Sequence, residues 1–239
     1  FVPVKSVAQQ DNQAAHRIRE ELVSHRTAKG NQIRGLVGEY GIVAPVGIHQ
    51  LRRALPDWLE DAENGLTEAF RTLLAGLAED LRTLDDRIDH LDERIAQGVK
   101  TDPVARRLLE LRGVGPLTAS ALAGALGDGK AFSKGRDFAA SIGLVPRQHS
   151  TGGKERLLGI SKRGDGYLRK LLVHGARAVL RHAANRDDGL SQWMNELSAR
   201  KHPNVATVAL ANKTARVAWA LVHNDTDYDP MRISGGQSV

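Results

Sequence analysis

The chain has 239 residues, of which 41 % are hydrophobic, enough for a sizeable core in one large or two ordinary domains. It has no cysteine, which excludes disulfides and thiolate metal sites, and an aromatic content of 4 %, which argues against a base-stacking platform. The net charge is +6, yet the window 141–186 holds ten Lys or Arg against two acids, so it carries +8 and the rest −2. Charge confined to a fifth of the chain indicates a polyanion site.

The first hundred residues predict helices that pack against another helix. Ser6 and Gln9 fit a capping box that opens a helix ending near Gly41. A second helical stretch follows the turn at 43–47, and Pro56 is expected to interrupt it. Apolar residues then recur at 3,4 spacing, which predicts a coiled-coil seam: Phe70, Leu74, Leu77, Leu81, Leu84, Ile88, Leu91 and Ile95. Its partner is either the first helix of the same chain or a second copy.

A linker is expected at 97–103, followed by a helix-hairpin-helix over 105–127. The glycines of Leu111-Arg112-Gly113-Val114-Gly115 allow a tight turn whose backbone amides can face a phosphate, and Pro116 suits the first helical position. The same turn could simply pack two helices together. We therefore expect Gly113 and Gly115 to contact DNA backbone, with packing as the alternative.

The stretch from Gly143 to Leu180 reads GLVPRQHSTGGKERLLGISKRGDGYLRKLLVHGARAVL. Residues 143–164 are expected to form an irregular loop or a small hairpin around Gly152 and Gly153, and Asp165 to open a basic helix over 165–184. Ser150 and Thr151 are candidate nucleophiles, because a hydroxyl beside glycines and cations can approach a phosphodiester. Such residues are also ordinary in loops.

The remaining cations of this region are candidate contacts to nucleic-acid backbone, since a basic face without intervening acids repels itself unless phosphates neutralise it. The expected contacts are Arg147, Lys154, Arg156, Lys162, Arg163, Lys170, Arg177 and Arg181, with Lys213 and Arg216 on the last helix. No metal site is expected, because the nine histidines are scattered without the paired spacing of a zinc site.

Three ordered motifs resemble the C-terminal part of the IS-110 family of insertion-sequence transposases. They read LLELRGVGPLTASALAGALGD, then GRDFAASIGLVPRQHSTGGKERLLGISKRGDGYLRKLLVHGARAVL, then ALANKTARVAWAL. The opening FVPVKSVAQQDNQAAHRIREELVSHRTAKGNQIRGLVGEYGI is similar to the segment that follows the catalytic domain of that family, so the resemblance covers about residues 1 to 230.

The resemblance implies a recombinase with an N-terminal RuvC-like domain whose four acidic residues bind magnesium, a coiled coil, and a C-terminal domain with a nucleophilic serine. It also implies a covalent phosphoserine link to DNA, a structured bridge RNA as guide, and a composite active site shared by subunits of a dimer or tetramer. Two departures stand out. The acidic domain is expected to be absent from this chain, and Thr151 stands directly before Gly152 where the family commonly has serine.

The sequence thus predicts an all-α fold with a helical arm over 1–100, a transposase C-terminal domain over 101–230 and a flexible tail over 231–239. The expected function is DNA transposition through a hydroxyl nucleophile, in a bacterial cytoplasmic, nucleoid-associated protein without a membrane segment. Ser150 is favoured over Thr151, because a primary hydroxyl is less hindered. The alternatives are a nucleic-acid-binding module or transposase remnant without chemistry, and a purely structural coiled-coil adaptor.

Overall fold

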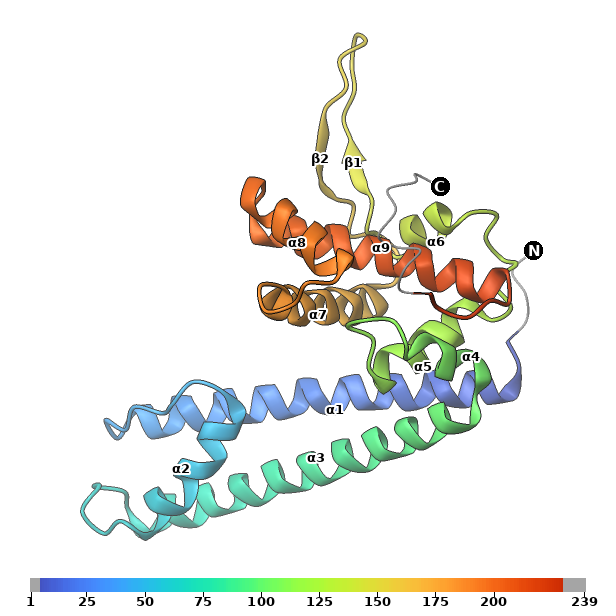
Figure 1. Cartoon of the computed structure of the whole chain (residues 1–239). Coiled ribbons are helices and arrows are strands. Elements are labelled where there is room, and N and C mark those ends of the chain that lie inside the picture. Colours follow the sequence, from blue (N-terminus) through green and yellow to red (C-terminus); the bar gives the residue numbers. More distant parts are fainter. Residues whose placement is uncertain (1–4, 230–239) are drawn as a thin grey trace. The chain divides into compact units, whose positions relative to one another are not determined.

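The computed structural model describes residues 5–229, and the tail predicted over 231–239 lies outside them. Helices dominate this part of the chain, with one two-stranded sheet, which confirms the all-α expectation (Figure 1). The chain divides into two compact units. One is Ala14–Arg94, and the other combines the residues up to Gln13 with those from Ile95 onward. No helix within 5–229 is long and apolar enough to cross a membrane.

The helices of the arm begin where the sequence predicts. Ser6 and Gln9 form the expected capping box. The backbone N–H of Gln9 donates to Ser6 Oγ at 3.2 Å, and the backbone N–H of Ser6 donates to Gln9 Oε1 at 2.9 Å. The second helix runs through Pro56 without interruption, so the break expected there is wrong. The three helices are α1 (Val7–Gly38), α2 (Ile48–Glu60) and α3 (Glu68–Thr101).

The seam of α3 is covered within the same chain. Its deepest residues repeat every seven positions, at Leu74, Leu81 and Ile88, all at most 2 % exposed. The intervening seam residues are half-buried: Leu77, Leu84 and Leu91. The core of this unit draws residues from all three helices and from Leu66 in the turn before α3: Ile33, Val37, Leu51, Leu55, Leu66, Phe70, Leu74 and Leu81. The seam is therefore the core of an intrachain helical hairpin, one of the two alternatives that its spacing allowed.

Ion pairs set the register of α1 against α3. Arg19 binds Asp92 through two nitrogens, and Lys29 Nζ lies 2.9 Å from Asp80 Oδ2. Between these two ion pairs lies Asp85, a residue buried at 5 % exposure. Arg26 Nη1 of α1 lies 3.0 Å from its Oδ1, and Arg52 Nη1 of α2 lies 2.9 Å from its Oδ2 without the alignment of a hydrogen bond. One buried carboxylate thus joins three helices.

Replacing Asp85 with Ala should lower the free energy of unfolding by about 3 kcal/mol, because it leaves two partly buried guanidinium groups without their counter-charge. Asp80→Ala is the matched control, since it breaks an ion pair on the same helix whose carboxylate is 58 % exposed, and it should cost at most about 1 kcal/mol. Urea unfolding followed by circular dichroism measures both. Equal losses in the two variants would contradict a special role for Asp85.

The other unit is a cluster of short helices around α9. Its elements are α4 (Pro103–Leu108), α5 (Pro116–Leu126), α6 (Gly135–Ser141), α7 (Gly166–Ala183), α8 (Gly189–Arg200) and α9 (Pro203–His223). On α9 the side chains of Ala206, Ala211, Ala215 and Ala218 are fully buried, so small residues let neighbouring helices approach closely. The linker expected at 97–103 is wrong, because α3 continues to Thr101 and Asp102 caps α4 directly.

Candidate nucleic-acid interface

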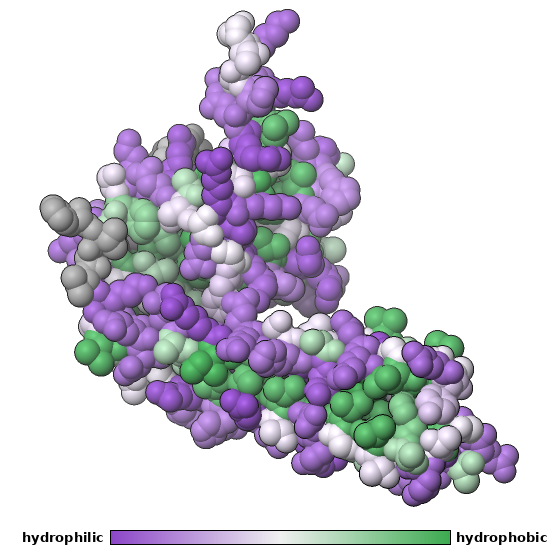
Figure 2. Space-filling view, turned by 180° about the vertical axis from the view of Figure 1, so that it is seen from behind, coloured by the Kyte–Doolittle hydropathy of each residue, from purple (hydrophilic) through white to green (hydrophobic). Residues whose placement is uncertain are grey.

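Residues 146–160 form a β-hairpin that projects from the helices (Figure 1). Strands β1 (Pro146–Gln148) and β2 (Leu157–Ile160) pair antiparallel. At the tip Gly152 and Gly153 have φ of +56° and +75°, the geometry of a type I′ turn. The residues 146–159 are all exposed, and the projection is largely hydrophilic in Figure 2. Of the two forms expected for this segment, loop or hairpin, the structure has the hairpin.

The base of the hairpin is fixed by backbone contacts. Arg169 of α7 donates from Nη1 to the carbonyl oxygens of Ile142, at 2.9 Å, and Arg163, at 3.0 Å. A Cβ on Gly164 would lie 1.7 Å from the Ser141 carbonyl oxygen, so the two chain segments touch where only glycine fits. Asp165 caps α7 as expected, accepting from the Leu168 amide at 2.9 Å. A rigid base thus carries an exposed tip.

The register separates the two candidate hydroxyls. Thr151 pairs with Lys154, Gln148 pairs with Leu157, and the His149 amide donates to the Arg156 carbonyl at 2.9 Å. Successive side chains of a strand point to opposite faces, and cross-strand partners share a face. Thr151 therefore shares its face with His149 and with three cations: Arg147, Lys154 and Arg156. Ser150 lies on the other face, where it accepts from Gln148 Nε2 at 3.0 Å.

The predicted phosphate contacts fall into two groups that the structure places on neighbouring segments. One group lies on the hairpin and its base and is exposed throughout: Arg147, Lys154, Arg156, Lys162 and Arg163. The other lies along the exposed face of α7, in the same unit: Lys170, Arg177 and Arg181, with His174 between them. Lys170 Nζ also lies 5.1 Å from the centre of the Tyr167 ring. The predicted basic surface thus spans α7 and the hairpin that precedes it in the chain.

Gly113 packs against α7. With φ of +80°, it lies so close to Gly175 that a Cβ would come within 2.7 Å of the Gly175 carbonyl oxygen. Gly115 is exposed at the N-terminus of α5, has φ of −94° and has no such neighbour. Packing thus accounts for Gly113, whereas the exposed amide of Gly115 is the one available to a phosphate. The contacts to DNA expected at these two glycines stay predictions.

Gly113→Ala should lower the free energy of unfolding by about 2 kcal/mol or more, since it forces a side chain into left-handed backbone and into the backbone of α7. The matched control is Gly115→Ala, where conformation and space both admit a methyl group, and its effect should stay within about 1 kcal/mol. Thermal unfolding compares the two. A Gly115 variant as unstable as the Gly113 variant would contradict the packing role.

Lys213 and Arg216 of α9 are half-buried, unlike the exposed cations above. Lys213 Nζ lies 4.7 Å from the centre of the Trp193 ring. Burial lowers the pKa of the Lys213 ammonium, and the nearby charge of Arg216 lowers it further. Packing therefore explains much of the position of Lys213, and the phosphate contacts expected of these two residues stay predictions.

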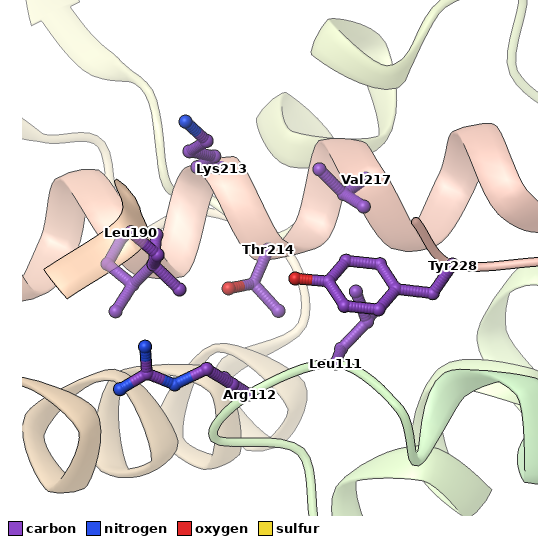
Figure 3. Close-up of a pocket in the computed structure, with 8 residues that line it drawn as sticks. Leu111, Arg112, Leu190, Lys213, Thr214, Val217 and Tyr228 are labelled. Carbon is purple, nitrogen blue, oxygen red and sulfur yellow. The ribbon is translucent and has the colours of Figure 1, made fainter. Parts of the chain in front are cut away.

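A small pocket beside Lys213 is shown in Figure 3. Its wall includes Tyr228, whose ring lies beside Thr214, and burial raises the pKa of the Tyr228 phenol. Arg112 lines the same pocket and is held by Asp188, at 2.5 Å, and by Ser191 Oγ, at 2.9 Å. Its remaining lining is largely apolar: Leu111, Leu190, Leu210 and Val217. The pocket thus lies where the α4–α5 turn packs against α8 and α9.

Two residues of the site were missed by sequence reasoning. Gln148 binds the Ser150 hydroxyl, and Arg169, counted only as positive charge, holds the hairpin base instead of facing a phosphate. The spacing of two between Gln148 and Ser150 was the available signal for a shared face, but it applies only once a strand is established.

The described residues do not fit a magnesium site. Among them, no three His, Asp or Glu side chains gather so as to hold a metal ion. The magnesium that the resemblance implies for an acidic domain therefore finds no ligand set among these residues.

Comparison with known proteins identifies the family. Residues 105–191 match the family described as Transposase IS116/IS110/IS902, a range that includes α5, the hairpin and α7. A probable family 20 transposase of Pseudomonas aeruginosa is 48 % identical over 231 residues, which is 96 % of this chain and 68 % of that protein. The chain belongs to the IS116/IS110/IS902 family of transposases.

Two further relatives are named after insertion sequences. The transposase for IS1111A of Coxiella burnetii is 44 % identical, covering 95 % of this chain and 63 % of the relative. The transposase for IS1328 of Yersinia enterocolitica is 41 % identical, covering 95 % and 67 %. The chain thus spans about two thirds of the length of these relatives. Membership of the family supports a role in DNA transposition and DNA as a partner.

Proposed function

We propose that this chain is the part of an insertion-sequence transposase that binds nucleic acid and supplies the hydroxyl nucleophile for strand exchange. The observation that carries the proposal is the projecting hairpin, which presents two hydroxyls and a set of cations on a rigid base. Attack by a hydroxyl on phosphorus keeps the energy of the broken phosphodiester in a new one, so that strands can be rejoined. Water as the nucleophile would lose that energy.

Ser150 is the first candidate for the nucleophile. Its primary hydroxyl is unhindered, and its Oγ accepts a hydrogen bond from Gln148, which leaves its own proton available to a base. Thr151 is the second candidate, since its face carries the cations that would neutralise a phosphate. The two hydroxyls lie on opposite faces of the hairpin, so one approach of DNA does not serve both equally.

The basic surface is the proposed binding site for the backbone of DNA, and of a structured bridge RNA. Hairpin cations would hold phosphates next to the scissile one, and the cations of α7 would hold flanking phosphates. We further propose that the active protein is a homo-oligomer whose acidic, magnesium-binding domain comes from another subunit. The alternative is a binding module without chemistry, which the same charges would also support.

The chain should bind duplex DNA with little sequence preference and strong salt dependence, because phosphate contacts dominate its surface. About five neutralised phosphates give a slope of log affinity against log salt near −4.5, from roughly −0.9 per phosphate. The triple variant Lys170→Ala, Arg177→Ala, Arg181→Ala should reduce that slope by up to about 3. Fluorescence anisotropy at several salt concentrations measures both.

A matched control removes as much positive charge from other exposed positions: Arg53→Ala, Arg94→Ala and Arg106→Ala. This variant has the same net charge as the first, so a flatter slope in the α7 variant alone would assign the effect to the basic surface. An equally flat slope in both variants would mean that net charge alone, and not the basic surface, sets the salt dependence.

Joined to the acidic domain and given its guide RNA and DNA substrate, the protein should form a covalent adduct with DNA. Ser150→Ala should abolish the adduct and leave DNA binding intact, since the hydroxyl takes no part in the charge contacts. Thr151→Ala should leave the adduct in place. Denaturing gel electrophoresis followed by mass spectrometry identifies the linked residue. An adduct that persists when both hydroxyls are removed would contradict the assignment of the nucleophile to this hairpin, whereas the lack of any adduct in the parent protein would support the module without chemistry.

A further inference from the structure

Ser150 and Glu155 occupy directly opposed positions in the hairpin. The bridge from Thr151 to Lys154 and the hydrogen bond from His149 to Arg156 enclose one intervening pair, which is Ser150 and Glu155. Both enclosing pairs are of the hydrogen-bonded type, since Lys154 donates its amide to Thr151 at 3.1 Å and His149 donates to Arg156 at 2.9 Å. The enclosed pair is then of the non-hydrogen-bonded type, in which side chains lie closer, with Cβ atoms about 5 Å apart.

The face around Ser150 therefore has two polar neighbours with complementary roles. Gln148 donates an N–H to Ser150 Oγ, which occupies one lone pair of the hydroxyl. Glu155 offers only acceptor oxygens when ionised, and it is the one acid in the hairpin sequence. No ion pair within 4 Å engages the Glu155 carboxylate in the described part of the chain. Its sequence neighbours Lys154 and Arg156 project from the opposite face.

We infer that Glu155 is the general base that takes the proton of the Ser150 hydroxyl, with Gln148 as a positioning residue that orients it. This inference rests on the proposed function and names the groups that activate its nucleophile. As the Ser150 Oγ–P bond forms, the hydroxyl proton passes to the carboxylate, and the departing oxygen leaves with the electron pair of the broken P–O bond. In the reverse step the protonated carboxyl returns its proton to Oγ, which regenerates serine.

A carboxylate beside a phosphodiester repels it, and the cations of the hairpin offset that repulsion. Lys154 and Arg156 flank Glu155 along the same strand and project from the opposite face, so the local charge balance around the acid is positive. The base then approaches the proton of Ser150, while the cations of the other face and the hairpin base attract the polyanion.

The chain itself allows a test that needs neither guide RNA nor substrate DNA. A dialkyl fluorophosphate phosphorylates activated hydroxyls: the Oγ–P bond forms, fluoride leaves with the P–F electron pair, and the proton goes to the base. Peptide mass spectrometry over time gives a labelling rate for each hydroxyl. Ser150 should react faster than the exposed Thr151, and Glu155→Gln, which keeps the size and removes the charge, should slow Ser150 by about 100-fold.

Three further variants separate the possible outcomes. Glu155→Asp should recover part of the rate, Gln148→Ala should lower it less than Glu155→Gln, and the control Asp128→Asn should leave it unchanged. A solvent deuterium isotope effect should be present in the parent chain and lost in Glu155→Gln, which a structural role alone would not produce.

Rapid labelling of Ser150 that is unaffected by Glu155→Gln would overturn the general-base role while leaving the proposed nucleophile standing. Labelling of Ser150 no faster than that of Thr151 would overturn the inference as well, since no activation would exist. The nucleophile itself is tested by the DNA adduct, so the two failures are distinguishable.

Discussion

The close contact between Gly113 and Gly175 determines what the basic helix can present. Because the α4–α5 turn touches the backbone of α7, the buried side of α7 needs no long side chains at that point. The opposite side is then free to carry a row of cations, and the first turn of the same helix supplies Arg169 to the hairpin base. One helix thus connects the packing of the unit with both groups of predicted phosphate contacts.

The hairpin has no hydrophobic core of its own. Its residues 146–159 are exposed, including Leu157 at 65 %, and a lone two-stranded hairpin is only marginally stable in water. Its stability therefore comes from the glycine turn at the tip and from the contacts at its base. Clustered cations on such an element repel each other, and a bound polyanion relieves that repulsion. The feature that weakens the isolated hairpin thus favours its association with nucleic acid.

Sequence patterns predicted the features that depend on neighbours in the chain. The capping box at Ser6, the cap at Asp165 and the heptad seam of α3 each depend on residues within one or two turns, and the structure confirms them. Contacts between distant residues were missed. The partner of Gly113 lies on α7, and the two arginines that pair with Asp85 lie on α1 and α2, so no local pattern marks them. The linker expected at 97–103 is absent because α3 continues to Thr101 and Asp102 caps the next helix directly.

For the candidate site, the residue types followed from the sequence and their arrangement did not. A shift of one residue moves a side chain to the other face of a strand, so only the pairing of Thr151 with Lys154 separates the surroundings of the two hydroxyls. Because the two hydroxyls are adjacent in the strand, they lie on opposite faces: Thr151 with the cations and Ser150 with Gln148. The threonine that replaces the serine common in the family before Gly152 therefore alters the cationic face alone. The primary hydroxyl at Ser150 keeps its amide donor and its opposed carboxylate, so a departure at Thr151 leaves the proposed role of Ser150 intact.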